Sequence, residues 1–235
     1  MLWDQLKAHF GFVLTIIAII AGLVLLSMLF ERYSKNKRKV SSTRRICIIS
    51  VSAALASVLM LIEFPLTFLA PEFYKLDFSD VPALLCGYYL GPTAAVLCEA
   101  VKIMLKLLLK PTSTAFIGEF ANFVVGCSLV LPAVMIYKLK AKRSYAIWGM
   151  VLGTVSLAVI GSSFNAFFLL PKFAEFYGMP LDAIVAMGTA VNGSIHSVST
   201  FVLFSVVPLN IIKGCAVSIL TLLLYKRVAR PLYSI

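Results

Sequence analysis

Long apolar runs separated by short polar segments fill most of the chain. A membrane-spanning helix needs about 20 mostly apolar residues, and we interpret seven runs as successive crossings of a bilayer: 11–30, 46–62, 81–90, 93–109, 115–136, 146–170 and 194–225. The pattern therefore predicts an all-α integral membrane protein, in which one extra amino-terminal transmembrane helix precedes a six-helix core.

The segment 31–45 is the one predicted boundary, because it is rich in Lys and Arg and separates the first run from the other six. We expect residues 1–43 to form the extra helix and a basic cytoplasmic linker, and residues 44–235 to form the six-helix domain. A cleaved signal peptide is the competing interpretation of the first run. Its leader is only weakly basic and no A-x-A cleavage site follows it, which favours a retained anchor helix.

Two further expectations concern the second half of the chain. The segment 171–193 is partly apolar, and we expect a short helix there that lies on the membrane surface or covers the core. Pro208 lies inside the last run. Because proline removes a backbone hydrogen bond from a helix, we expect this position to interrupt or redirect the last helix.

Composition and charge agree with a membrane location. Hydrophobic residues make up 61% of the chain, charged residues make up 13%, and the mean hydropathy is +0.98. Much of the net charge of +11 comes from basic clusters at 32–45, 138–143 and 226–230. Such clusters at the ends of apolar runs mark cytoplasmic loops. We therefore expect a multi-pass protein of the cell membrane, with its amino terminus outside, its carboxyl terminus in the cytoplasm and no nucleic-acid partner.

A polar, aromatic-rich loop at 63–80 follows the second run and is predicted to lie outside the cell. Its mixture of acids, Lys75 and aromatic residues is typical of a ligand lid, and almost equally typical of an ordered turn. Asp80 directly precedes the next helix, where we expect it to act as a cap. Asp77 then remains free for a ligand.

Polar side chains inside apolar runs are candidates for a binding site, because a charge at the centre of a spanning helix costs about 2.5 to 3.5 kcal/mol. Lys213 follows Asn210 by three residues, on the same helix face, and is predicted to bind a ligand. The alternative is that it snorkels or pairs with Glu119 or Glu99. Glu119 and Asn122 share a face near the outer end of their helix, where ligand contact and an interhelical hydrogen bond are equally supported.

The other polar groups in the runs favour structural roles. Asn165 lies near the outer end of its helix, at a position more typical of a cap or a helix contact than of a ligand contact. Lys102 and Lys106 are predicted to balance Glu99. Lys110 is predicted to snorkel at the membrane interface.

The sequence contains no pattern for catalysis or metal binding. His196 has neither a second histidine nor an H-x-x-x-x-D sequence beside it, and the five cysteines show no C-x-x-C spacing. There is also no G-x-x-x-x-G-K-[ST] phosphate loop. We therefore predict a protein that is not an enzyme, has no catalytic residues, metal or cofactor, and does not hydrolyse ATP by this route.

Four segments, MLIEFP, KLDFSDVPALL, GEFANFVVG and VVPLNIIKG, together resemble a known family. They are similar to the riboflavin-specific S components, the substrate-binding membrane subunits of energy-coupling factor (ECF) vitamin transporters. The resemblance extends over about residues 44–228. That family has six helices with both ends in the cytoplasm, so the extra helix at 11–30 departs from its pattern.

The resemblance implies a subunit that captures riboflavin from outside the cell and is not an enzyme. In this family a separate transmembrane T component and two cytoplasmic ATPases supply the energy, and the S component is thought to topple in the bilayer to release its ligand. Small residues at four-residue spacing allow close helix approach. They resemble the family's docking surface for the T component: Ser50, Ala53, Ala54 and Ser57.

Riboflavin has a flat, uncharged ring, a pyrimidine edge and a polyhydroxyl tail, so its site requires apolar walls with a few donors and acceptors. We expect Leu76, Phe64 and Phe78 to line the ring. The polar side chains expected to bind are Lys75, Asp77, Glu119, Asn122, Asn165, Asn210 and Lys213. The alternatives are an S component for another vitamin, a precursor or a flavin nucleotide, a packing or accessory membrane protein, and a membrane enzyme.

Overall fold

The computed structural model of the protein describes residues 10–34 and 40–233. In chain order its elements are α2 (Phe10–Tyr33), α3 (Ser42–Leu61), β1 (Phe64–Pro65), β2 (Lys75–Leu76), α4 (Asp80–Leu90), α5 (Pro92–Leu109), α6 (Ile117–Lys140), α7 (Arg143–Ser156), η1 (Leu157–Gly161), α8 (Ser162–Phe164), η2 (Asn165–Leu169), α9 (Leu170–Tyr177), α10 (Leu181–Val191), α11 (Val198–Phe201), η3 (Val202–Val206) and α12 (Val207–Tyr233).

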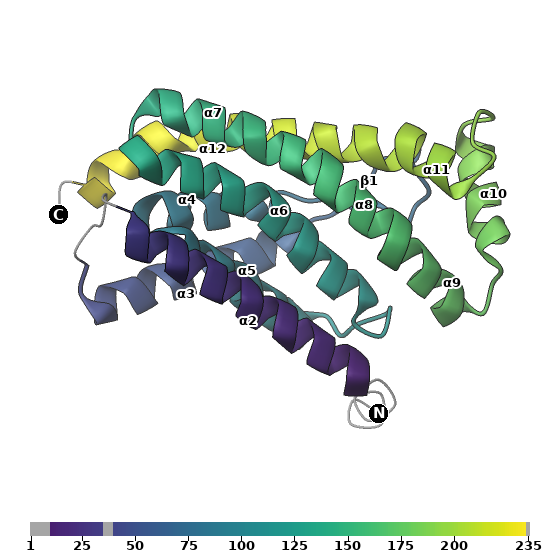
Figure 1. Cartoon of the computed structure of the whole chain (residues 1–235), viewed down its shortest axis with the longest axis horizontal. Helices are drawn as coiled ribbons and strands as arrows, with labels where there is room; N and C mark the ends of the chain where they lie inside the picture. Colours follow the sequence, from purple (N-terminus) through teal and green to yellow (C-terminus); the bar gives the residue numbers. More distant parts are fainter. Residues whose placement is uncertain (1–9, 35–39, 234–235) are drawn as a thin grey trace.

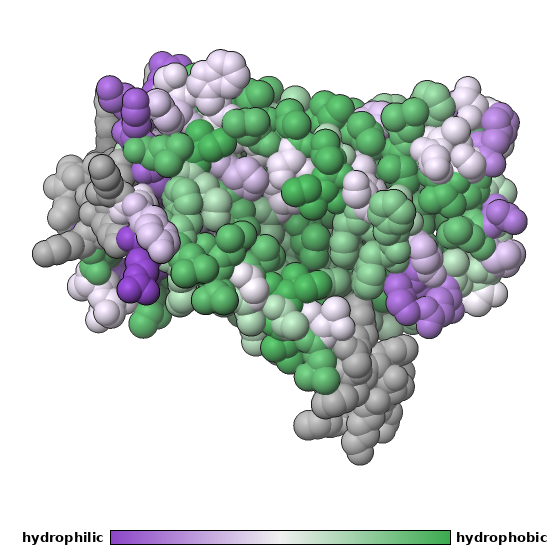
Figure 2. All heavy atoms as spheres, viewed as in Figure 1, coloured by the Kyte–Doolittle hydropathy of each residue, from purple (hydrophilic) through white to green (hydrophobic). Residues whose placement is uncertain are grey.

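Long helices lie side by side along the longest axis of the molecule (Figure 1). Within the described residues, five stretches are long and apolar enough to cross a membrane: Leu14–Tyr33, Ser42–Leu61, Ile117–Lys140, Arg143–Tyr177 and Val198–Tyr225. On the face shown in Figure 2, apolar side chains fill the middle of the surface and polar side chains gather at its two ends. The predicted all-α membrane fold is confirmed.

The third and fourth predicted crossings correspond to α4 and α5. With 11 residues, α4 is roughly 16 Å long at 1.5 Å per residue, about half the thickness of a bilayer's hydrocarbon core. Most of its residues are buried inside the bundle. The preceding loop also packs into the bundle, because Ala70, Tyr74, Leu76 and Asp77 are all buried. This loop is therefore part of the fold.

A wide π-helical turn precedes each of two prolines and accommodates it within a helix. Pro171 follows η2 and Pro208 follows η3, and the backbone stays helical on both sides of each proline. A π turn adds one residue to the helix, which gives room where the proline ring would otherwise meet the preceding turn. The predictions that a crossing ends at Leu170 and that Pro208 interrupts the last helix are therefore wrong. The predicted short helix within 171–193 is present as α10.

The described basic segments gather at one end of the molecule. In Figure 1 the end of α2, the start of α3, the connection from α6 to α7 and the end of α12 all lie on the left. The residues at 35–39 and the side chains at 226–230 lie outside the described part. At the opposite end lie α9, α10 and α11. β1 lies nearer the middle of the molecule and pairs antiparallel with β2, with Phe64 opposite Leu76.

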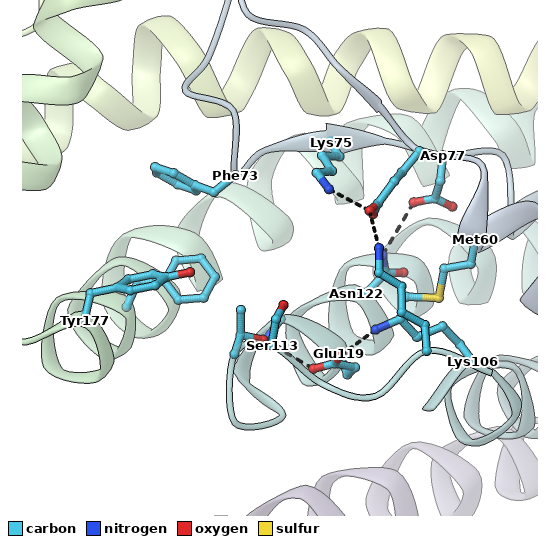
Figure 3. A pocket seen from close by; sticks show the side chains of 14 residues that line it. Met60, Phe73, Lys75, Asp77, Lys106, Ser113, Glu119, Asn122 and Tyr177 are labelled. Atoms are coloured by element: carbon cyan, nitrogen blue, oxygen red, sulfur yellow. Dashed lines mark hydrogen bonds and ion pairs between the residues drawn. The ribbon is translucent and has the colours of Figure 1, made fainter. Parts of the chain in front are cut away.

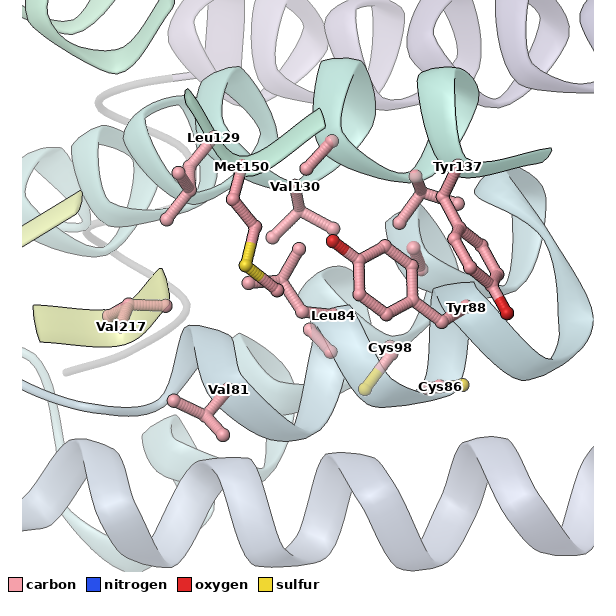
Figure 4. Close-up of a cluster of buried hydrophobic side chains, with 14 of the residues drawn as sticks. Val81, Leu84, Cys86, Tyr88, Cys98, Leu129, Val130, Tyr137, Met150 and Val217 are labelled. Atoms are coloured by element: carbon pink, nitrogen blue, oxygen red, sulfur yellow. The ribbon is translucent and has the colours of Figure 1, made fainter. Parts of the chain in front are cut away.

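Two large hydrophobic clusters pack the helices against one another. One joins α4, α5, α6, α7 and α12, and includes Leu84, Tyr88, Leu129 and Met150 (Figure 4). The other lies toward α9, α10 and α11 and contains these residues, among others: Ala70, Tyr74, Leu169, Phe173, Ile184, Ile195 and Phe201. The aromatic ring of Tyr74 thus fixes the loop to the end of the bundle where the site lies.

Candidate functional site

Five charged side chains from separate parts of the chain form a buried ion-pair cluster. Lys102 Nζ lies 2.9 Å from Asp80 Oδ1 and 2.5 Å from Glu99 Oε2. Lys213 Nζ lies 3.1 Å from Asp77 Oδ2 and 3.2 Å from Asp80 Oδ2. Each of these side chains is at most 5% exposed. The cluster therefore joins the loop before α4, α4 itself, α5 and α12.

The structure gives two aspartates partners that the sequence did not predict. Asp77 is not free, since its carboxylate accepts hydrogen bonds from the backbone N–H and the hydroxyl of Ser79 and pairs with Lys213. Burial opposes its charge, but Lys213, Lys102 and the Ser79 hydrogen bonds outweigh burial, so the pKa of Asp77 is lowered. Asp80 is not a cap: Ser79 is the N-cap residue, and Asp80 contacts the two lysines.

Helix α6 meets the cluster at Gly126. A Cβ added there would lie 2.7 Å from Glu99 Oε2 and 3.0 Å from Asp80 Oδ1. One turn earlier on the same helix, the Asn122 Nδ2 lies 3.5 Å from Asp77 Oδ2. The absence of a side chain at position 126 thus lets α6 approach closely enough for Asn122 to reach the loop.

The pairing of the other lysines differs in part from the prediction. Lys102 balances Glu99, as predicted. Lys106 instead pairs with Glu119, at 2.6 Å from Nζ to Oε1. Lys213 pairs with Asp77 and Asp80 rather than with either glutamate.

A cavity of about 320 Å³ opens beside this cluster, between the loop, α5, α6 and α9. Figure 3 shows Phe73 and Tyr177 at one side and polar side chains at the other, and the full lining is Met60, Glu63, Phe73, Lys75, Asp77, Lys106, Lys110, Ser113, Thr114, Gly118, Glu119, Asn122, Phe173 and Tyr177. Its volume is within the range of small-molecule sites, about 300 to 1,000 Å³.

A second cavity of about 120 Å³ shares five lining residues with the first. It is lined by Phe73, Tyr74, Lys75, Gly118, Ala121, Asn122, Val125, Asn165, Leu169, Phe173, Leu209, Asn210 and Lys213. The two cavities therefore adjoin, and together they combine apolar walls with amide and charged groups.

One carboxylate oxygen joins three elements at the rim of the larger cavity. Glu63 Oε1 lies 2.6 Å from Lys75 Nζ and 3.1 Å from Lys110 Nζ. Burial opposes the charge of Glu63, but the hydrogen bonds and charges of both lysines outweigh burial, so its pKa is lowered from the ordinary 4.5. We call Glu63, Lys75 and Lys110 the rim clasp. It connects the end of α3 to β2 and to the end of α5.

The loop between α5 and α6 closes another side of the larger cavity. Glu119 accepts a hydrogen bond from Thr112 Oγ1 at 2.9 Å. Thr112 Oγ1 in turn accepts the N–H of Phe116 at 3.0 Å. Ala115 and Phe116 both have positive φ, at 47° and 69°, a strained conformation that often occurs at functional sites. The Thr112 hydroxyl thus holds this turn and orients Glu119.

Two asparagines that line the smaller cavity are held by hydrogen bonds to other parts of the chain. Asn165 Oδ1 accepts a hydrogen bond from the Tyr74 hydroxyl at 2.9 Å, and its Nδ2 donates to the Gly161 carbonyl at 2.7 Å. Asn210 Nδ2 donates to Ser162 Oγ at 3.0 Å. Asn165 begins the π-helical turn η2, a type of distortion frequent at functional sites.

The structure brings most of the predicted binding residues together. Those that line one or both cavities are Lys75, Asp77, Glu119, Asn122, Asn165, Asn210 and Lys213. Leu76 and Phe78 line neither of these two cavities. Leu76 is buried, and Phe78 packs against the hydrophobic cluster around α4. Phe64 is 51% exposed on β1, so the aromatic wall predicted for the ring lies elsewhere.

The aromatic wall was missed in the sequence. Phe73 and Tyr74 come from the same loop, while Phe173 and Tyr177 come from a segment predicted to lie at the surface. Phe73 and Phe173 pack edge to face at 5.8 Å. The spacing of residues 173 and 177 by one helical turn was the available signal, because it places both rings on one face of α9.

The predicted docking surface on α3 divides into two faces. Ser50 and Ala54 are exposed, whereas Ala53 and Ser57 are buried within the bundle. Residues three apart on a helix need not share the same exposure when a neighbouring helix covers part of the surface. Ala53 and Ser57 therefore cannot form an external docking surface, and that part of the prediction is corrected.

Comparison with known proteins places this geometry in a family. Residues 44–225 match the family model described as ECF transporter, substrate-specific component. The chain belongs to the substrate-specific (S) components of ECF transporters. A solved structure of the S component of a bacterial ECF transporter has 36% sequence identity and a TM-score of 0.64, covering 82% of this chain and 99% of that chain.

Curated relatives include two proteins named as riboflavin transporters. The riboflavin transporter RibU of Staphylococcus aureus (strain TCH60) is 36% identical over 195 residues, which cover 83% of this chain and 95% of the relative. The riboflavin transporter FmnP of Bacillus subtilis (strain 168) is 30% identical over 184 residues, covering 77% and 90%. The predicted family is confirmed, and its members are transport subunits, not enzymes.

The buried cluster of this S component predicts a large effect of removing Lys213. Taking away one partner of a buried ion pair costs about 3 to 5 kcal/mol, so Lys213→Met should lower the free energy of unfolding by about that amount. A lower thermal midpoint of the detergent-solubilised protein would report it. Adding Asp77→Asn should recover part of the loss, because it removes the carboxylate left unpaired.

Lys172→Met is the matched control for that experiment. Lys172 pairs with Glu175 at an exposed position, where an ion pair contributes about 1 kcal/mol or less. If Lys213→Met changed stability no more than this control does, the buried pairing would be contradicted.

The rim clasp predicts a pH-dependent contribution to stability. The folded protein lowers the pKa of Glu63, so its contribution is fully present above the unfolded pKa of about 4.5 and is lost as pH falls through the lower folded pKa. Glu63→Gln should cost about 0.2 to 1 kcal/mol at neutral pH. The difference in thermal midpoint between wild type and variant should shrink below pH 4.5, and a constant difference would refute the clasp. Glu175→Gln is the exposed control.

Proposed function

We propose that this S component binds riboflavin in the two adjoining cavities and delivers it as part of an ATP-driven uptake transporter. The relatives named as riboflavin transporters support this substrate. The chemistry of the cavities supports it as well, because a flat ring requires apolar walls and a pyrimidine edge requires a few donors and acceptors. No cofactor is needed for this role.

The apolar part of the site suits the ring. Phe73, Phe173, Leu169 and Leu209 line the smaller cavity, and aromatic walls can stack on or meet the edge of a flat ring system. The polar residues proposed to contact riboflavin are Lys75, Asp77, Glu119, Asn122, Asn165, Asn210 and Lys213. Leu76 and Phe78 are left out of this proposal because of their positions in the core.

The main structural support for this proposal is the position of Asn122. It lines both cavities, and its Oδ1 is buried without a hydrogen-bond partner among the described residues. A buried carbonyl oxygen left unpaired costs about 1 to 3 kcal/mol. A ring N–H of the ligand would satisfy it, which gives binding a specific polar contact at the centre of the site.

The charges around the larger cavity favour an uncharged flavin over a phosphorylated one. Its lining lysines pair with carboxylates: Lys106 with Glu119, and Lys75 and Lys110 with Glu63. A phosphate group would have to displace a carboxylate to reach one of these cations. The flavin nucleotide alternative is therefore less well supported than riboflavin.

The basic clusters support an orientation for transport. Basic residues at helix ends favour the cytoplasmic side, and their end of the molecule lies opposite α9 and α10 (Figure 1). The cavity lining includes Tyr177, Lys110 and Gly118, at helix ends away from the basic clusters. We accordingly place the carboxyl terminus in the cytoplasm of a bacterial cell and the cavities toward the outside.

The S-component assignment also supports partners that this chain lacks. ATP must be hydrolysed elsewhere, since the chain has no phosphate loop. We propose that a transmembrane T component and two cytoplasmic ATPases complete the transporter.

We also propose that residues 1–43 form an extra unit beside a substrate-binding domain at 44–235. On α3, the exposed Ser50 and Ala54 are the remaining candidates for the docking surface, because small residues permit close helix approach.

Riboflavin binding is tested directly on the purified protein. We expect copurified flavin by mass spectrometry, or quenching of flavin fluorescence on titration of the ligand-free protein with riboflavin. Asn122→Ala should weaken affinity about 5- to 150-fold, the equivalent of about 1 to 3 kcal/mol for a buried polar contact. Flavin mononucleotide should bind more weakly than riboflavin.

Asn192→Ala provides the matched control, because Asn192 ends α10 and lines neither of the two cavities. It should leave affinity unchanged. Neither copurified flavin nor quenching in the wild type would overturn the proposed substrate. Mass spectrometry that found a different vitamin would support the alternative S-component assignment.

Docking on α3 is tested with bulky substitutions. Ser50→Phe and Ala54→Phe should reduce copurification of the T component and ATPases while riboflavin affinity stays near the wild-type value. Ala21→Phe on α2 is the control, since Ala21 is also a small exposed residue on an apolar helix. Equal copurification of all three variants with the wild type would exclude this surface.

A further inference from the structure

We infer that α2 helps to position the substrate site of this S component. Its Glu31 caps the start of α5, the helix that carries Lys102 and Lys106 and leads directly into Lys110. The family match begins at residue 44, so α2 lies outside it. The inference deepens the proposed function. Only its affinity measurement rests on that proposed function, because the hydrogen-exchange measurement needs no riboflavin.

One stripe of α2 packs against the bundle. Its buried and half-buried positions recur every three or four residues, and they are Ile16, Ile19, Ile20, Leu23, Val24, Ser27, Phe30 and Glu31. Ile20, Leu23 and Val24 pack on a cluster from α5 and α6 that includes Val96 and Phe123. A helix with a single contact face at this spacing is docked in a fixed rotation. The contacts of α2 therefore hold it against α5 and α6, beyond its covalent link to α3.

The start of α5 has no cap of its own. Gly91 is the N-cap residue and has no side chain to accept a hydrogen bond, and Pro92 occupies the first turn. The first amides of a helix require an acceptor from elsewhere. Glu31, 62 positions earlier in the chain, supplies it: Oε1 accepts the Thr93 N–H at 3.0 Å.

Gly91 is matched to this contact in two ways. Its φ of +121° is a conformation that side chains disfavour, and an added Cβ would lie 2.4 Å from Glu31 Oε1. The other carboxylate oxygen, Oε2, lies 3.6 Å from Arg45 Nη2 at the start of α3. One carboxylate thereby joins α2, α3 and α5, and its negative charge also suits the positive end of the α5 dipole.

The position of α5 matters to the site because this helix supplies cations to it. Lys102 lies in the buried cluster, Lys106 holds Glu119, and Lys110 follows directly after α5 and belongs to the rim clasp. The partners of Glu31 described above, Thr93 and Arg45, line neither of the two cavities. We therefore assign it as a positioning residue that acts through α5.

The cap is tested by hydrogen exchange on the full-length protein in detergent. In Glu31→Ala, amides in a peptide covering 91–96 should exchange about 2- to 30-fold faster, the range for a lost helix cap. Glu31→Gln keeps an acceptor oxygen but loses the negative charge, so its amides at 91–96 should exchange more slowly than those of Glu31→Ala and still faster than those of the wild type. Its difference from the wild type is the readout if the alanine variant does not fold. Unchanged exchange in the foldable variants, or a glutamine variant no better than alanine, would overturn the cap.

The effect on the site is tested with the same variants. Riboflavin affinity should fall about 2- to 10-fold in Glu31→Ala, less than the full cap range because α5 is also held by packing, and should recover in part in Glu31→Gln. Leu29→Ala, on the exposed side of α2, should change neither exchange at 91–96 nor affinity. Faster exchange with unchanged affinity would overturn the positioning role. Absence of riboflavin binding by the wild type would overturn the proposed substrate, while the exchange result would still decide the cap.

Discussion

The structure depends on pairing three carboxylates with two ammonium groups away from water. An isolated buried charge is expensive, and good geometry with several partners is what offsets that cost. Asp80 is central because it contacts both Lys102 and Lys213. Asp77 extends the same network into the loop before α4. The loop is thus held inside the bundle by charge as well as by Tyr74, and this is why its neighbouring residues can form a wall of the cavities.

Features set by neighbouring residues could be predicted from the sequence, whereas pairings between distant residues could not. Apolar runs and basic clusters were enough for an all-α membrane bundle with its basic ends together. Polar residues in apolar runs, such as Asn165 and Lys213, predicted part of the lining of the smaller cavity. Nothing in the sequence showed that Lys213 pairs with Asp77, 136 positions away. The partners of Asp77 and Asp80 were missed for the same reason, since only the fold brings the lysines to these two carboxylates.

The other differences between prediction and structure arise where the surrounding structure overrides a local sequence rule. Proline usually breaks a helix, but a π turn next to Pro208 keeps this one continuous. A two-residue pairing of β1 and β2 sets which loop residues point inward, and so Leu76 faces the core rather than a ligand. The run that forms α2 is apolar on all sides, which concealed its contact face. Its one acidic residue near the end, Glu31, was the visible exception.

Two groups of ion pairs described above, the rim clasp and the buried cluster, differ in their contact with water. The rim clasp has side chains 29% to 55% exposed, whereas those of the buried cluster are at most 5% exposed. Dissolved ions screen exposed charges strongly and buried charges much less. Ionic strength therefore acts on the mouth of the cavity and leaves the interior largely untouched. A rise in the salt concentration around the protein would weaken the links between α3, β2 and the end of α5 at the cavity rim without loosening the bundle that supports them.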